Sequence, residues 1–114
     1  MTEHHEQVLL FRWMALYPEL ECAFAIPNGG HRHKAVAAKL KAEGVKRGVP
    51  DIFIPIPRDE YHGLFIEMKA KKGSLSDAQR CYRSILSGYG YRVDVCKGFE
   101  AAQEVIRGYM QWTK

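Results

Sequence analysis

Two apolar segments joined by a short polar connection constrain the fold of this chain more than any other feature. The first, GVPDIFIPIP, spans residues 48–57, and the second, GLFIEMKAKKG, spans residues 63–73. Their β-branched and aromatic residues favour strands. The connection between them is too short for the crossover that a parallel pair requires, so the strands should pair antiparallel. The sequence therefore predicts a buried β-hairpin.

Helices and further strands are expected around this hairpin. Apolar residues recur at helical spacing over residues 3–17, 31–44 and 99–112, and Ser76 with Gln79 forms a capping-box pattern that begins another helix. Further strands are predicted over 21–26 and 91–97, and the strand–helix–strand order from 63 to 97 indicates a parallel crossover. We expect an α/β fold, a mixed β-sheet flanked by α-helices.

Size and charge limit the classes of function. The 114 residues form one domain, 1–114, and 46% hydrophobic against 26% charged residues is ordinary for a soluble globular protein. The net charge of +4 is compatible with a polyanionic partner such as nucleic acid. No apolar run reaches the roughly 18–20 residues of a membrane span, so we expect a cytoplasmic protein that does not enter membranes.

Charged residues lie where the two predicted strands meet. Asp51 begins the first strand, while Glu67 and Lys69 close the second and, two positions apart, point to the same face. In an antiparallel hairpin the start of one strand lies beside the end of the other, so Asp51 can reach Glu67 and Lys69. Two adjacent carboxylates repel each other unless a cation neutralises them. Oxygen-only ligands suit Mg²⁺ or Mn²⁺.

Such a metal site favours phosphodiester hydrolysis. A carboxylate-held ion activates water and stabilises phosphoryl charge, and Lys69 beside it can position that water or stabilise the transition state. Glu6 lies on the apolar side of the first helix and would need a cation if it faces inward. Each residue also has a plainer interpretation: a solvated Glu67–Lys69 ion pair, a turn role for Asp51, a helix-dipole role for Glu6, and only a capping role for Gln79.

Taken together, the motifs PD at residues 50–51 and EMK at 67–69 resemble the PD-(D/E)xK phosphodiesterase superfamily, with its restriction-endonuclease-like core. With IPNGG, GVPD and LSDAQ, the pattern resembles the virus-type replication-repair nuclease (VRR-NUC) family over nearly the whole chain. The resemblance implies the site residues, namely metal ligation by Asp51, Glu67 and the Met68 carbonyl, catalysis by Lys69, and a site lined by Glu6, preferred to Glu3, and by Gln79.

The resemblance also implies a substrate. Stand-alone members of the family resemble homodimeric nucleases of four-way (Holliday) junctions, which predicts a metal-dependent DNA endonuclease with branched DNA as its partner. A flap nuclease and a non-catalytic nucleic-acid-binding domain remain alternatives. Phosphate contacts are predicted for six basic residues, and the exposed-helix alternative stays open for those in 31–44. They are Arg32, Lys34, Lys46, Arg47, Lys71 and Lys72.

The final helix offers an apolar stripe with two possible uses. Tyr109, Met110 and Trp112 could form a dimer surface, but core packing is the commoner use of such residues.

Overall fold

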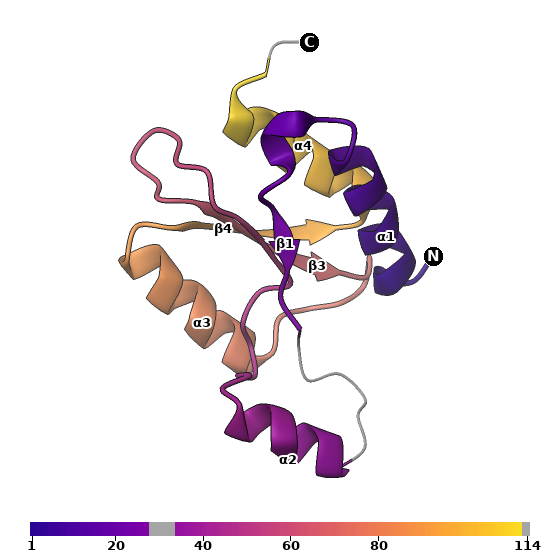
Figure 1. Ribbon diagram of the computed structural model, residues 1–114, viewed down its shortest axis with the longest axis vertical. Helices are drawn as coiled ribbons and strands as arrows, with labels where there is room; N and C mark the ends of the chain where they lie inside the picture. The colour runs from indigo at the N-terminus through magenta and orange to yellow at the C-terminus, as the bar shows by residue number, and fades with distance from the viewer. Residues whose placement is uncertain (28–33, 113–114) are drawn as a thin grey trace.

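The computed structural model describes residues 1–27 and 34–112, with four strands and four α-helices in the described part (Figure 1). The elements in chain order are α1 (Glu3–Met14), the 3₁₀-helix η1 (Pro18–Leu20), β1 (Phe24–Ala25), α2 (Lys34–Ala42), β2 (Ile52–Ile54), β3 (Leu64–Lys69), α3 (Asp77–Gly88), β4 (Arg92–Lys97) and α4 (Phe99–Met110).

The strands form one mixed sheet in the order β1-β2-β3-β4. The predicted hairpin is confirmed: β2 pairs antiparallel with β3, with Ile52 opposite Ile66 and Ile54 opposite Leu64. The predicted crossover is also confirmed, since β3 and β4 are parallel. β2 ends at Ile54, so Pro55 lies just beyond the central strand and removes no ladder hydrogen bond from it.

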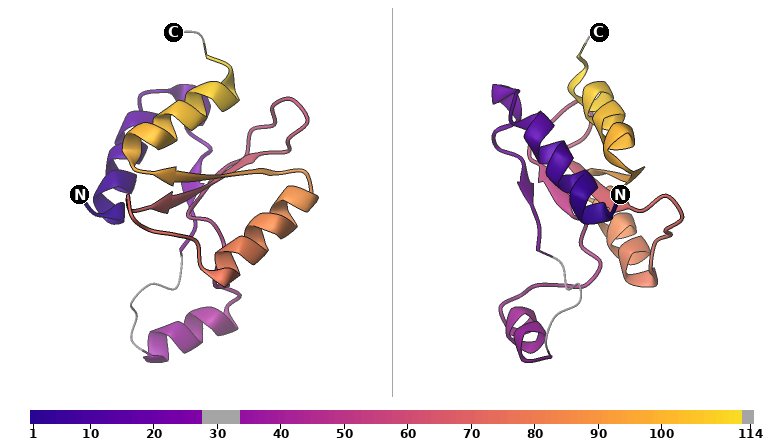
Figure 2. Two further views of the ribbon diagram at one scale, coloured as in Figure 1. Left: turned by 180° about the vertical axis from the view of Figure 1, so that it is seen from behind. Right: turned by 90° about the vertical axis from the view of Figure 1, so that its right-hand side faces the viewer.

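One face of the sheet is closed by α1 and α4, which lie side by side over it (Figure 2). Ile52, Ile54, Leu64, Ile66 and Met68 are almost fully buried on this face. They form one cluster with apolar residues of the two helices, which are Leu10, Trp13, Met14, Ala102, Ile106, Tyr109 and Met110. This cluster is the hydrophobic core.

The C-terminal helix is therefore part of the core. Tyr109 and Met110 are buried and Trp112 packs against the same cluster, as the core interpretation of this stripe predicted. The Tyr109 hydroxyl donates to the Ile56 carbonyl oxygen at 2.6 Å, which ties α4 to the end of β2. This use removes the stripe as a candidate dimer surface.

The opposite face of the sheet is covered less completely. α3 packs against β4, whereas α2 lies at the lower end of the molecule and contains no buried residue (Figures 1 and 2). Phe53 and Phe65, paired across β2 and β3, point to this face, and Phe24 of β1 lies opposite Phe53. Their rings are in contact, at 4.3 Å between the Phe53 and Phe65 centroids and 5.8 Å between those of Phe24 and Phe53.

Two predicted boundaries are wrong for local reasons. The first helix ends at Met14, not Tyr17, because Tyr17 precedes Pro18 and takes an extended conformation, with φ −117° and ψ 108°. The strand predicted over 21–26 shrinks to Phe24–Ala25, because Ala23 still belongs to a turn closed by its N–H and the Leu20 carbonyl. None of the helices in the described ranges is long and apolar enough to cross a bilayer.

Candidate active site

Asp51 is fixed by backbone contacts on both sides. Its N–H donates to the Ile66 carbonyl oxygen at 3.0 Å, and its carbonyl oxygen accepts from the Ile26 N–H at 2.7 Å. These two bonds extend the pairing of β2 with β3 and with β1 by one residue before the start of β2. Asp51 therefore holds its place between two strands rather than in a free turn.

Gly48 fixes the position of the loop before Asp51. This buried glycine has φ +91°, and a Cβ atom there would lie 2.5 Å from the carbonyl carbon of Ala78 in the first turn of α3. A side chain fits neither the conformation nor the space. The contact brings the start of α3 against the loop that presents Asp51.

The Asp51 side chain reaches the end of β3. Its Oδ2 accepts a hydrogen bond from the Met68 N–H at 2.7 Å, a contact that spans both strands of the hairpin. Glu67 immediately precedes that amide, and Lys69 follows it on the same side of the strand as Glu67. The structure thus brings Asp51, Glu67 and Lys69 together.

Glu67 is a buried acid in direct contact with another acid. Its exposed fraction is only 4%, and it is the single buried charged residue in the described ranges. Burial raises the pKa of Glu67 from its ordinary 4.5 to about 9, with further increases from a hydrogen bond to Asp51 and from the Asp51 charge; Lys69 acts in the opposite direction. In the metal-free protein at neutral pH, Glu67 is therefore protonated and bonded to Asp51.

This pair has the chemistry of a divalent metal site. A proton satisfies the two carboxyl groups in the metal-free protein, and a cation bound between them would replace it. Mg²⁺ commonly uses one or two carboxylates and completes its shell with water and phosphate oxygens. Within residues 1–27 and 34–112 no cluster of three or more His, Cys, Asp or Glu side chains is placed to hold a metal ion, and the acids at this point are the pair Asp51 and Glu67. The Met68 side chain is buried in the core, so only its backbone carbonyl could serve as a ligand.

Two acids at the start of α1 have different positions. The Glu6 Oε1 accepts a hydrogen bond from the Phe99 N–H at 2.9 Å, at the first residue of α4. Gly98, the N-cap of that helix, has no side chain to supply this bond, and a Cβ atom there would lie 3.5 Å from the Glu6 Oε2. Glu6 thus caps α4 from another helix. Glu3 is instead the α1 acid whose charge helps to raise the Glu67 pKa.

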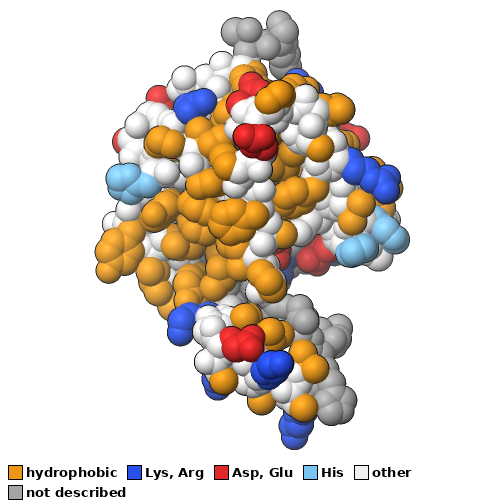
Figure 3. All heavy atoms as spheres, viewed as in Figure 1, with side chains coloured by type: hydrophobic (Ala, Val, Ile, Leu, Met, Phe, Trp, Pro, Cys, Tyr) orange, Lys and Arg blue, Asp and Glu red, His pale blue; other side chains and the backbone are white. Residues whose placement is uncertain are grey.

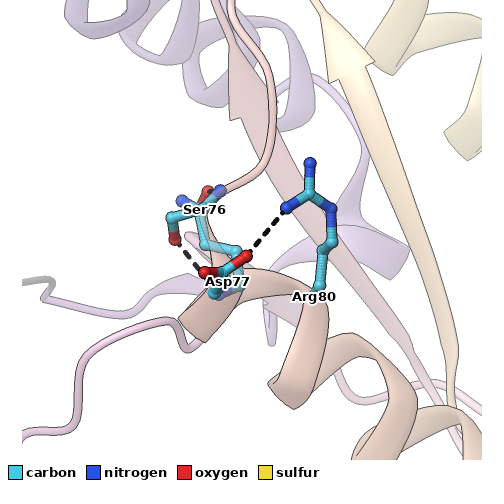
Figure 4. A network of polar contacts seen from close by, with 4 residues as sticks. Ser76, Asp77 and Arg80 are labelled. Atoms are coloured by element: carbon cyan, nitrogen blue, oxygen red, sulfur yellow. Dashed lines mark hydrogen bonds and ion pairs between the residues drawn. The ribbon is translucent and has the colours of Figure 1, made fainter.

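Gln79 forms the predicted capping box at the start of α3. Its N–H donates to the Ser76 Oγ at 3.2 Å, and its Oε1 accepts from the Ser76 N–H at 2.9 Å. Figure 4 shows the same turn, where Arg80 also pairs with the exposed Asp77 at 3.1 Å. The side-chain oxygen of Gln79 is engaged with the backbone, and Ala78 beside it touches Gly48.

Four of the predicted phosphate-binding residues lie in the loops next to Asp51 and Lys69. Lys46 and Arg47 are exposed in the loop that leads to Asp51, and Lys71 and Lys72 are exposed in the turn that follows Lys69. Lys34 is exposed at the start of α2. Arg32, together with the asparagine and glycines of IPNGG, lies outside the described residues.

Two features of the site were missed by sequence reasoning. The structural role of Glu6 required knowing that α1 and α4 are neighbours, which no local pattern reveals. The Gly48–Ala78 contact joins segments that are distant in sequence, although the glycine in GVPD was a visible signal for a positive φ.

The chain resembles known proteins over most of its length. The family model of the VRR-NUC domain matches residues 1–100. A solved structure described as a VRR_NUC domain protein is 32% identical, with a TM-score of 0.85, over 97% of this chain and 89% of the other. No curated protein matches the chain. The predicted fold class, a mixed sheet flanked by helices, is confirmed by this structural similarity.

Proposed function

Because the chain belongs to the VRR-NUC family of nuclease-type domains, we propose that it is a Mg²⁺- or Mn²⁺-dependent endonuclease of branched DNA. The observation that carries this proposal is the Asp51 carboxylate bonded to the Met68 N–H at 2.7 Å, beside the buried Glu67 and on the same edge as Lys69. A buried acid beside a second acid is costly to a fold, and such perturbed groups cluster at functional sites.

Each residue has a distinct task in this proposal. Asp51, Glu67 and the Met68 carbonyl would hold the divalent ion, and Gln79 would line the site. When bound, the ion supplies Lewis-acid stabilisation of phosphoryl charge and lowers the pKa of a coordinated water. Lys69 orients the attacking water and stabilises negative charge on the scissile phosphate. Lys46, Arg47, Lys71 and Lys72 bind the flanking phosphates, so DNA is held mainly by its backbone.

Purified protein should be tested on duplex, flap and four-way-junction DNA with Mg²⁺, Mn²⁺ or EDTA. We expect cleavage of the four-way junction with either metal and none with EDTA. Lys69→Ala should lower the cleavage rate about 10²–10⁴-fold while DNA binding persists. Lys97→Ala is the matched control, since Lys97 of β4 is the partner of Lys69 in the parallel ladder between β3 and β4.

The alternatives give different results in the same assay. Preferential cleavage of flaps would assign the protein to the flap-type nucleases. Binding of DNA without cleavage under any metal condition would support a non-catalytic nucleic-acid-binding domain and contradict the proposal.

Assembly is the second part of the proposal. A four-way junction is resolved by two cuts on two strands, so two sites related by a twofold axis suit this substrate. A homodimer is therefore the expected active form.

A further inference from the structure

The described chain carries two apolar surfaces that its own fold leaves exposed. The first, which we name the aromatic face, comprises Phe24, Phe53, Ile85 and Tyr89 on the less covered side of the sheet and on α3. Phe24 is 49% and Tyr89 is 74% exposed. Figure 3 shows hydrophobic side chains gathered over β1 and α3, with few charged groups among them.

The aromatic face approaches the size of the largest apolar patch on a typical monomer. An aromatic side chain carries about 150–250 Å² of surface, so Phe24 and Tyr89 alone leave roughly 200–300 Å² of mostly apolar area in water. Ile85 adds to it. The largest apolar patch on a soluble protein is often functional.

The second surface is one side of α2, which we name the α2 stripe. Val36 and Leu40 lie one turn apart on the same side of this helix, with Ala37 beside them. Val36 is 45% exposed, and no residue of α2 is buried. A nine-residue helix gains little stability from propensity alone and normally depends on packing of its apolar side.

The charges around the two surfaces are complementary. Lys39 and Lys41 border Leu40 on either side of the α2 stripe, and both are exposed. Glu19 and Glu21 are exposed in the segment that leads into β1, next to Phe24 of the aromatic face. A helix with a lysine-bordered apolar stripe therefore suits a surface with an acidic border.

We propose that the α2 stripe of one copy packs on the aromatic face of a second copy, and that the second copy returns the same contact. In the described structure α2 stands apart from the β1–α3 surface of its own chain (Figures 1 and 2). A twofold axis forms the contact twice, which brings the buried area toward the roughly 800 Å² per partner of a stable interface. This inference rests on the proposed homodimer and identifies its surfaces.

The first test measures molar mass by sedimentation equilibrium without DNA or metal, so it does not depend on nuclease activity. The wild-type chain should have twice its 13.1 kDa mass. Val36→Asp in the α2 stripe and Phe24→Asp in the aromatic face should each raise the dissociation constant at least tenfold. Leu16→Asp is the matched control, because Leu16 is 73% exposed and belongs to neither surface. Circular dichroism checks that each variant is folded.

Mixing the variants gives a sharper test. A Val36→Asp chain keeps its aromatic face and a Phe24→Asp chain keeps its α2 stripe, so an equimolar mixture should form a heterodimer through one intact contact. A zero-length carbodiimide should also join Lys39 or Lys41 to Glu19 or Glu21 between ¹⁴N- and ¹⁵N-labelled wild-type copies.

Several results would overturn the inference. A monomeric wild-type chain, a dimer unaffected by both substitutions, or a mixture of variants that stays monomeric would each do so. Cross-links found only within one copy would show that α2 covers its own aromatic face. If the chain is monomeric and Phe24→Asp weakens DNA binding, the aromatic face contacts nucleic acid instead. Cleavage without dimerisation would refute this inference and leave the nuclease proposal standing.

Discussion

The face of the sheet against α1 and α4 is largely apolar, with the Arg92–Asp94 ion pair on its edge strand β4, whereas the opposite face carries Asp51, Glu67 and Lys69 at one end. β3 contributes to both faces by alternation, with Leu64, Ile66 and Met68 in the core. The face covered by α1 and α4 stabilises the fold, and this stability offsets the cost of holding Asp51 and Glu67 together on the other face. The difference explains why the hairpin that presents these charged residues is embedded in a rigid core.

The largest expected effect is on stability, and it differs between the two faces of the same strand, β3. Leu64→Ala removes a fully buried side chain from the closed face and should lower the free energy of unfolding by about 2–5 kcal/mol. Lys69→Ala, on the other face of the same strand, should change it by less than about 1 kcal/mol because Lys69 is half-exposed. Urea denaturation of both variants measures the contrast. Equal losses of stability would show that the two faces are not functionally distinct.

The predictability of the two faces also differs. The closed face followed from local patterns, since alternation in residues 63–70 and the short connection to residues 48–57 determine strands, pairing and core side. The meeting of Asp51 with Glu67 was a direct consequence of that hairpin. The helix boundaries near Tyr17 and the length of β1 depended instead on turns that no periodic pattern describes.

Long-range contacts account for what sequence reasoning could not supply. Both Glu3 and Glu6 lie in the first turn of α1, and only the position of α4 distinguishes them. The acid expected to approach the metal, Glu6, is the one bonded to Phe99. The start of α4 is capped by a side chain from α1, more than 90 residues earlier, so no local sequence pattern predicts this contact.

The next prediction concerns Glu67, on the face of the sheet opposite to α1 and α4. Because the pKa of Glu67 is raised from 4.5 to about 9, the folded protein binds this proton more tightly than the unfolded chain. The resulting stability is complete below pH 4.5 and is lost as the pH rises toward 9. The amide of Glu67→Gln stays neutral at every pH in this range. At pH 8 without metal, this variant should therefore have a Tm about 3–10 °C higher than wild type.

Calorimetric scans from pH 5 to pH 9 in EDTA would measure this difference, which should grow with pH. Mg²⁺ should stabilise the wild type at pH 8 and leave Glu67→Gln almost unchanged, because the variant lacks a ligand. A Tm difference that shrinks as the pH rises would contradict the assignment of a buried Glu67 that is protonated and bonded to Asp51.

The smallest expected effect distinguishes the two acids of α1. Glu6→Gln weakens the acceptor for the Phe99 N–H and removes the negative charge at the start of α4, so it should cost about 0.5–2 kcal/mol of stability. Glu3→Gln leaves that bond intact and removes a charge that disfavours ionised Glu67, so the metal-free protein should lose little stability and Glu67 should ionise at lower pH. Urea denaturation and Mn²⁺ titration of both variants provide the comparison. If Glu6→Gln weakens Mn²⁺ binding with no loss of stability, Glu6 belongs to the metal site and the α1–α4 cap is secondary.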